Sequence, residues 1–185
     1  MDFPPLEAFG GLIFDLDGTL FNSMPSHIAA WQQAARECGF SLTSDFIVER
    51  GGMSSLDVAR ELAQSGCPVG DPEAFAQRKF ALYQERLPHI RPFDAVRAQL
   101  ERALARGQKI AVGSGTQRSN ATFLLNQAGI RCHALICAED VTRHKPDPET
   151  FLLAAGQLGL TPPEIAVFED GAPGVAAAAA GGFAC

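Results

Sequence analysis

The chain has 185 residues, of which 46% are apolar and 19% are charged, and its formal net charge is −6. This length suits one well-packed domain with a modest insertion, and no apolar stretch reaches the roughly 18 residues of a membrane-spanning helix. The negative charge and the lack of a dense Lys/Arg run argue against a nucleic-acid-binding protein. We therefore expect neither nucleic acid nor a membrane as a partner.

The N-terminal segment MDFPPLEAFGG has no basic region followed by an apolar one, so it does not resemble a secretory signal. The cysteines are scattered, without CxxC or zinc-site spacing: Cys38, Cys67, Cys132, Cys137 and Cys185. We expect reduced thiols and a cytoplasmic location.

The first expected element is a short buried strand, GLIF (11–14), which ends at the acidic, glycine-containing turn DLDGT. From Pro25 to about Leu87 the pattern is helical. Apolar residues recur there at three- and four-residue spacing, with Ser or Asp at the helix starts, in segments 26–38, 55–66 and 71–87.

After Pro88 and Pro92, helices alternate with short apolar strands. The expected helices are 93–107, 117–129, 148–159 and 173–181, and the expected strands are 109–113, 133–140 and 164–170. This alternation predicts βαβ units and a parallel sheet. The predicted fold class is a doubly wound α/β domain made of residues 1–22 and 92–185, interrupted by a helical insertion of residues 23–91.

Polar side chains follow the predicted strands, at the edge where doubly wound sheets bind ligands. They are Asp15, Asp17, Ser114, Thr116, Lys145, Glu169 and Asp170. Several carboxylates this close together repel one another unless a cation compensates for them. Oxygen ligands without His or Cys favour Mg²⁺ over zinc, so Mg²⁺ is the predicted cofactor.

These residues suit phosphoryl transfer. The carboxylate of Asp15 can act as nucleophile, while Lys145 and Ser114 hold phosphate oxygens. Asp17 can protonate the leaving oxygen and later deprotonate water. Gly18 permits a tight turn that brings backbone N–H groups close to the phosphate.

Four ordered segments resemble the motifs of the haloacid dehalogenase superfamily: FDLDGTL (14–20), KIAVGSGT (109–116), HKPDPETF (144–151) and VFEDGAPG (167–174). The helical insertion directly after the first motif is similar to the branch with an α-helical cap, which holds sugar-phosphate phosphatases and β-phosphoglucomutase-like proteins. The resemblance covers the chain from about Gly10 onward and implies a Rossmann-like core.

The resemblance also implies roles for individual residues. Asp15 would form an aspartyl-phosphate, Asp17 would be the general acid/base, and Lys145 would pair with Asp15 and phosphate. The metal would be held by Asp15, the backbone carbonyl of Asp17 and Asp170, with Glu169 close to the metal or its waters.

The implied phosphate- and substrate-binding residues are Ser114, Gly115, Thr116, His27 and Lys79. Four of them have a plainer alternative: Ser114 could merely cap the end of a strand, and Thr116 could cap the helix that begins at Gln117. His27 could be packed on an amphipathic helix, and Lys79 could lie on a solvated face. Asn22 stands where many relatives carry another aspartate, which we expect to affect hinge or cap contacts.

The predicted function is hydrolysis of a small phosphorylated metabolite, such as the sugar phosphate fructose 1-phosphate, by a monomeric enzyme. The main alternative is a β-phosphoglucomutase, which needs extra cap cations to grip a second phosphate. Mutase relatives carry an arginine where the stretch Gly52-Met53-Ser54-Ser55 has serine, although Arg50 is nearby. Asp17 argues against a dehalogenase, and the intact Asp15 and Asp17 argue against a non-catalytic binding protein.

Overall fold

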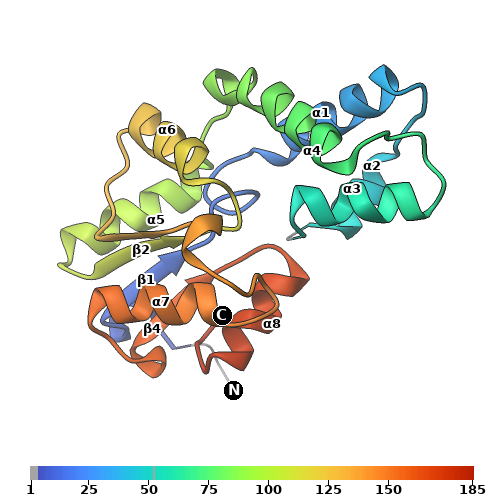
Figure 1. Cartoon of the computed structure of the whole chain (residues 1–185). Coiled ribbons are helices and arrows are strands. Elements are labelled where there is room, and N and C mark those ends of the chain that lie inside the picture. Colours follow the sequence, from blue (N-terminus) through green and yellow to red (C-terminus); the bar gives the residue numbers. More distant parts are fainter. Residues whose placement is uncertain (1–3, 52) are drawn as a thin grey trace.

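A computed structural model describes residues 4–51 and 53–185. Within these residues, four parallel strands form one sheet in the order β3-β2-β1-β4. The strands are β1 (Gly11–Phe14), β2 (Lys109–Gly113), β3 (Ala134–Ile136) and β4 (Ile165–Phe168). The predicted fold class, a doubly wound α/β core with an inserted helical segment, is confirmed (Figure 1).

Helices cover both faces of the sheet because alternate strand residues point to opposite sides. Leu12 and Phe14 belong to one hydrophobic cluster with buried side chains of α5 (Asp94–Ala105) and α6 (Arg118–Ala128). Ile13 belongs to a second cluster with α7 (Glu149–Leu158) and α8 (Ala172–Ala180). Both faces are therefore buried, which explains why the strands are continuous apolar runs.

The segment between β1 and α5 is helical, with α1 (Met24–Glu37), α2 (Ser44–Glu49), α3 (Ser55–Gln64) and α4 (Pro72–Gln84). Helix α4 packs on both α1 and α3. Helix α2 was not among the expected helices. With 6 residues, this helix is too short for apolar residues to recur at a recognisable helical spacing. It is capped at its start by Thr43, whose hydroxyl accepts a hydrogen bond from the Phe46 N–H at 3.2 Å.

The chain enters and leaves this helical segment at one place. The Asn22 N–H donates to the Arg91 carbonyl at 2.9 Å, and the Phe93 N–H donates to the Leu20 carbonyl at 2.9 Å. Phe21 and Pro92 form an antiparallel bridge between these bonds. The two connections therefore lie side by side, next to the end of β1.

The expected strand at 133–140 is wrong in its second half. Strand β3 covers only Ala134–Ile136, and a 3-10 turn follows at Ala138–Asp140. The Asp140 carboxylate accepts a hydrogen bond from the Cys137 N–H at 2.7 Å, and the Ala138 N–H donates to the Thr116 carbonyl at 3.0 Å. These bonds turn the chain out of the sheet. Other 3-10 turns are Leu6–Ala8, Leu87–His89 and Pro162–Glu164.

No helix in the described residues has the length and apolar character that crossing a bilayer requires.

Candidate active site

Asp15 follows the last residue of β1, at the carboxyl edge of the sheet. Phe14 is level with Val112 of β2 and with Phe168 of β4, so the ends of the three strands meet. The Asp15 N–H donates to the Phe168 carbonyl at 2.9 Å, which fixes the backbone of the residue. The Asp15 residue is only 6% exposed.

Lys145 joins the carboxylates of two strand ends. Its Nζ lies 2.6 Å from Oδ1 of Asp15 and 2.7 Å from Oε2 of Glu169, and it also donates to the Gly113 carbonyl at 3.3 Å. The ammonium is buried, with 7% of its side chain exposed. The aromatic ring of Phe151 lies beneath it, 4.6 Å from ring centroid to Nζ.

Burial raises the pKa of Asp15 to about 7, although the charge and hydrogen bond of Lys145 act in the opposite direction; Glu169 and Asp17 raise it further. Burial lowers the pKa of Lys145, but the charges of Asp15 and Glu169 outweigh this effect and hold it above its ordinary value. Lys145 is therefore a permanent cation beside a carboxylate that is difficult to ionise.

Three carboxyl groups gather at this edge of the sheet. Asp15, Glu169 and Asp170 each offer an oxygen, and these oxygens lie within 4.8 Å of one another. One ammonium compensates for only part of their charge. The donor set is entirely hard oxygen, which fits Mg²⁺.

Asp170 is held by the turn that follows β1. The Thr19 hydroxyl donates to its Oδ1 at 2.7 Å. Gly18 has a φ of 91°, and a side-chain carbon on Gly18 would lie 2.9 Å from the carboxyl carbon of Asp170. Glycine is thus needed here both for the left-handed turn and for the close approach of the carboxylate. Thr19 was not among the predicted site residues, although it lies inside the DLDGT turn.

Asp17 contacts the helical segment instead of the carboxyl cluster. His27 Nε2 lies 3.3 Å from its Oδ1, and the Tyr83 hydroxyl donates to the same oxygen at 3.2 Å. Burial acts to raise the pKa of Asp17, but His27, with smaller contributions from hydrogen bonds of Ser23 and Tyr83, lowers it to about 2. In this arrangement Asp17 is a carboxylate.

Lys79 extends the same chain of contacts. Its Nζ lies 3.1 Å from Nδ1 of His27 and 3.4 Å from the hydroxyl of Ser55, and the residue is 6% exposed. Burial lowers its pKa to about 8, with Asp17 acting in the opposite direction. Burial and the charge of Lys79 also lower the pKa of His27. The alternative that Lys79 lies on a solvated helical face is wrong.

Tyr83 was missed by the sequence analysis. Its ring stacks on His27 with centroids 3.9 Å apart, and the residue is 1% exposed. Burial, together with the charge and hydrogen bond of Asp17, raises the pKa of its hydroxyl. The available signal was spacing, because Tyr83 follows Lys79 by four residues in one helix and therefore lies on the same face.

The loop after β2 contains the predicted phosphate-binding residues. Ser114 is buried at 1% exposure, and its hydroxyl accepts a hydrogen bond from the Thr116 N–H at 3.0 Å. Gly115 is exposed between them. Helix α6 begins after Gln117, and its first N–H, that of Arg118, donates to the Glu139 carboxylate at 3.1 Å, so the alternative that Thr116 caps this helix is wrong.

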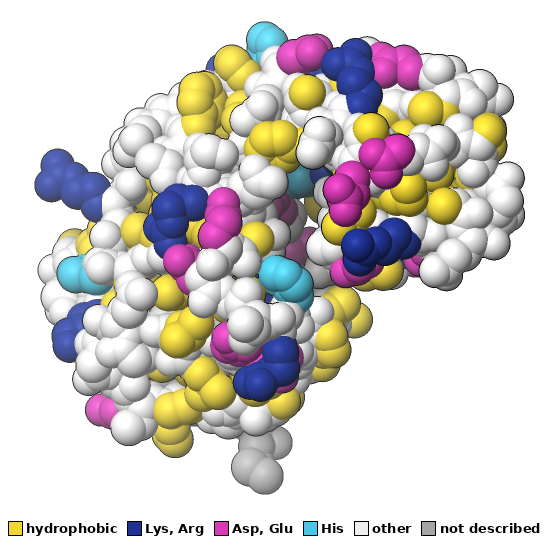
Figure 2. Space-filling model, viewed as in Figure 1, with side chains coloured by type: hydrophobic (Ala, Val, Ile, Leu, Met, Phe, Trp, Pro, Cys, Tyr) yellow, Lys and Arg dark blue, Asp and Glu magenta, His cyan; other side chains and the backbone are white. Residues whose placement is uncertain are grey.

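The face drawn in Figure 2 is hollowed between the helical segment and the α/β part, and acidic side chains are visible inside the hollow. The contacts of Asp17 with His27 and Tyr83 bridge these two parts of the chain. Two groups of predicted site residues are therefore joined by contacts: Asp15, Glu169 and Lys145 form one, and Asp17, His27 and Lys79 form the other.

A model of the haloacid dehalogenase-like hydrolase family matches residues 9–182. The chain belongs to this family. It is 32% identical over 180 residues to the fructose-1-phosphate phosphatase YqaB of Escherichia coli (strain K12), covering 96% of this chain and 95% of that protein. It is 26% identical over 181 residues to the β-phosphoglucomutase of Bacillus subtilis (strain 168), covering 93% of this chain and 80% of that protein.

The crystal structure of a β-phosphoglucomutase from Clostridium difficile matches with a TM-score of 0.84 at 23% identity, covering 95% of this chain and 82% of that chain. This likeness shows the shared fold. The predictions of the family, of its fold and of a hydrolase acting on phosphoric monoesters agree with these comparisons.

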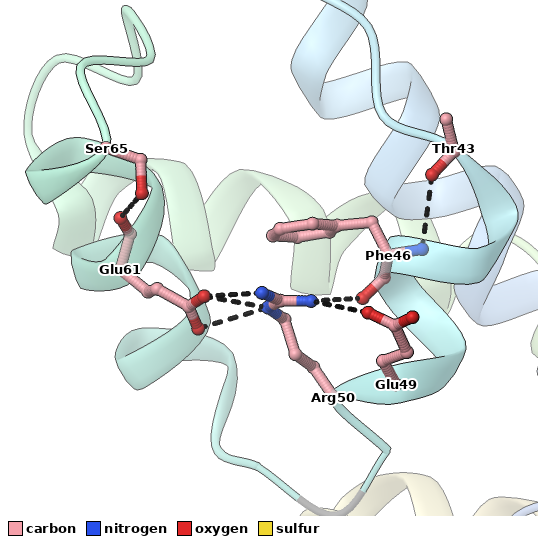
Figure 3. A network of polar contacts seen from close by, with 6 residues as sticks. All are labelled: Thr43, Phe46, Glu49, Arg50, Glu61 and Ser65. Carbon is pink, nitrogen blue, oxygen red and sulfur yellow. Dashed lines mark hydrogen bonds and ion pairs between the residues drawn. The ribbon is translucent and has the colours of Figure 1, made fainter.

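Arg50 is engaged within the helical segment (Figure 3). Its Nε and Nη2 donate to the carboxylate of Glu61, with the shortest distance 2.5 Å, and its Nη1 donates to the Phe46 carbonyl at 3.0 Å. The guanidinium also lies 3.6 Å above the Phe46 ring centroid. Of the stretch compared with mutases, Gly52 lies outside the described residues, and Ser54 caps α3.

Proposed function

We propose that this protein is a Mg²⁺-dependent phosphatase that hydrolyses a small sugar phosphate through an aspartyl-phosphate on Asp15. The observation that carries the proposal is the buried pairing of Asp15 with Lys145 at the carboxyl edge of the sheet. A carboxylate held at this edge, with its negative charge compensated, is suited to attack a phosphoryl group. The E. coli relative named as a fructose-1-phosphate phosphatase supports the substrate class.

In the first step, an oxygen of Asp15 forms a bond to phosphorus while the bond to the ester oxygen breaks. Asp17 gives its proton to that leaving oxygen. In the second step, Asp17 accepts a proton from water, the water oxygen bonds to phosphorus, and the bond from phosphorus to Asp15 breaks. Inorganic phosphate leaves, and both side chains return to their starting states.

The remaining residues hold the phosphoryl oxygens. Lys145 would orient Asp15 and neutralise part of the phosphoryl charge, while the Ser114 hydroxyl, the Gly115 N–H and the Thr116 hydroxyl would donate hydrogen bonds to the phosphate oxygens. Asp15, Asp170, Glu169 and the backbone of Asp17 would hold Mg²⁺. When bound, the ion supplies positive charge to the phosphoryl oxygens.

We further propose that residues 23–91 act as a cap on a core of residues 1–22 and 92–185. The paired connections at Asn22 and Arg91 would serve as the hinge. His27 and Tyr83 hold Asp17 as a carboxylate in the present arrangement, so loss of these contacts would allow Asp17 to carry a proton to the leaving group. The cytoplasmic location and monomeric state stay predictions.

Mutase activity is the second candidate, because a β-phosphoglucomutase is among the relatives. A mutase must hold a second phosphate while the bisphosphate intermediate turns. The cap arginine that could serve, Arg50, has its guanidinium engaged by Glu61 and by the Phe46 carbonyl. This arrangement favours hydrolysis.

The test measures phosphate released from a panel of small phosphate esters, including fructose 1-phosphate, with Mg²⁺ and with a chelator. Activity that requires Mg²⁺ and is lost in Asp15→Asn is expected. Asp94→Asn is the matched control, because Asp94 is an exposed aspartate at the start of α5. Conversion of β-glucose 1-phosphate to glucose 6-phosphate without net phosphate release would establish the mutase instead.

A further inference from the structure

Helix α8 begins two residues after the acidic pair Glu169 and Asp170, which follows β4. Gly171 precedes the helix, and Gly174 lies in its first turn and is buried. The carboxylate of Glu169 lies over this turn, where its Oε1 accepts a hydrogen bond from the Gly171 N–H at 3.0 Å. Backbone N–H groups at a helix start favour a negative charge in this position.

The side chain of Glu169 occupies the space that a side chain at position 174 would fill. A methyl carbon added to Gly174 would lie 2.5 Å from Cγ of Glu169 and would overlap its carboxyl group. These distances are far shorter than the contacts that side-chain carbons make in proteins, so Glu169 would have to move. Its present position is tied at both carboxylate oxygens, to the Gly171 N–H and to Lys145 at 2.7 Å.

We infer that Gly174 is a positioning residue of the active site, because the absence of a side chain there is what allows Glu169 to reach Lys145. The Lys145 ammonium is held by two carboxylates, those of Asp15 and Glu169. Displacement of Glu169 would leave Asp15 as the only one of these two partners. Gly174 acts through Glu169, whose atoms are the nearest to the position that a side-chain carbon on Gly174 would take. The inference rests on the proposed phosphatase function only where catalysis is its readout.

The chain offers a matched control. Gly156 lies within helix α7, is exposed, and would bring an added methyl carbon within 4 Å of nothing. Alanine stabilises the interior of a helix relative to glycine, so Gly156→Ala is expected to leave the melting temperature unchanged or raised. If propensity alone mattered, Gly174→Ala would behave in the same way.

The experiment is a double-mutant cycle that measures the melting temperature and the kinetics of ester hydrolysis. With Glu169 present, Gly174→Ala should lower the melting temperature by about 2–8 °C and reduce kcat/KM about 10- to 100-fold. In the Glu169→Ala background, where nothing remains to be displaced, the same substitution should change kcat/KM by less than about two-fold and should not lower the melting temperature.

Equal losses in both backgrounds would overturn the inference, because they would show that Gly174 matters through the helix and not through Glu169. If Glu169→Ala does not fold, Glu169→Asp replaces it as the background: its side chain is one methylene shorter, so a smaller loss supports the inference and an undiminished loss contradicts it. A wild type without phosphatase activity would refute the proposed function, while the melting temperatures would still decide the role of Gly174.

Discussion

Replacing Asp15 by asparagine should stabilise the metal-free protein at pH 8. In the folded protein burial raises the pKa of Asp15 from 3.8 to about 7. A group whose folded-state pKa lies above its unfolded-state pKa ionises first in the unfolded chain. The contribution of Asp15 to the free energy of unfolding therefore falls as the pH rises from about 4 to about 7, and above that range its full loss is present.

The size of the effect follows from the same pKa values. A difference between 3.8 and about 7 corresponds to about 4 kcal/mol at full ionisation. Asparagine has the shape of the protonated acid and avoids this loss, but it gives up the charge-assisted hydrogen bond from Lys145. Lys145 keeps Glu169 as a partner. We expect Asp15→Asn to be more stable than the wild type by about 2–4 kcal/mol at pH 8.

The assay is urea denaturation of wild type, Asp15→Asn and the control Asp94→Asn between pH 4 and pH 8, in the presence of a chelator. The stability difference between Asp15→Asn and wild type should grow across this range and vanish near pH 4. Addition of Mg²⁺ should reduce the difference by stabilising the wild type more. A difference that stays constant with pH would refute the conclusion that Asp15 is held at an energetic disadvantage.

Other substitutions test the contacts of the site one at a time. Lys145→Met leaves buried carboxylates without their cation and should lower the free energy of unfolding by about 3–5 kcal/mol at pH 8, measured with urea without metal. Tyr83→Phe keeps the ring but removes a donor that lowers the pKa of Asp17, so the limb of the pH–rate profile that reports Asp17 should move to higher pH. Gly18→Ala forces a side chain into a φ of 91° and against Asp170. It should weaken Mg²⁺ binding about ten-fold by calorimetry.

For each of these three substitutions, one result would contradict the prediction. Wild-type stability in Lys145→Met would show that the two carboxylates do not depend on the ammonium. An unmoved profile in Tyr83→Phe would mean that the hydroxyl does not influence Asp17 during turnover. If folded Gly18→Ala binds Mg²⁺ as tightly as the wild type, the turn at Gly18 does not position Asp170 as a metal ligand.

Much of the core could be predicted from local patterns. Strand β1 has the predicted bounds, and β2 matches the predicted segment 109–113. Both strands are short apolar runs that end at polar or glycine-containing turns, and burial on both faces gives such runs an unambiguous pattern. The polar residues after them follow from the rule that parallel strands present their carboxyl ends at one edge.

The errors have equally local causes. Only the first half of the segment 133–140 forms a strand. The hydrogen bond from the Cys137 N–H to the Asp140 carboxylate ends the extended conformation. Helix α2 depends on the cap formed by Thr43. Neither a short cap nor a side-chain hydrogen bond produces a periodic signal in the sequence.

The sequence by itself determined the order of elements, the edge at which the polar groups gather, and the family that its four motifs resemble, because these features depend on periodicity and on short contiguous segments. Only the tertiary structure decided which side chains meet across long separations. Tyr83 of α4 reaches Asp17 in the turn after β1, and Gly174 leaves room for Glu169. Such contacts depend on side-chain direction and packing between elements, and nothing in the linear pattern encodes a distance of a few ångströms between them.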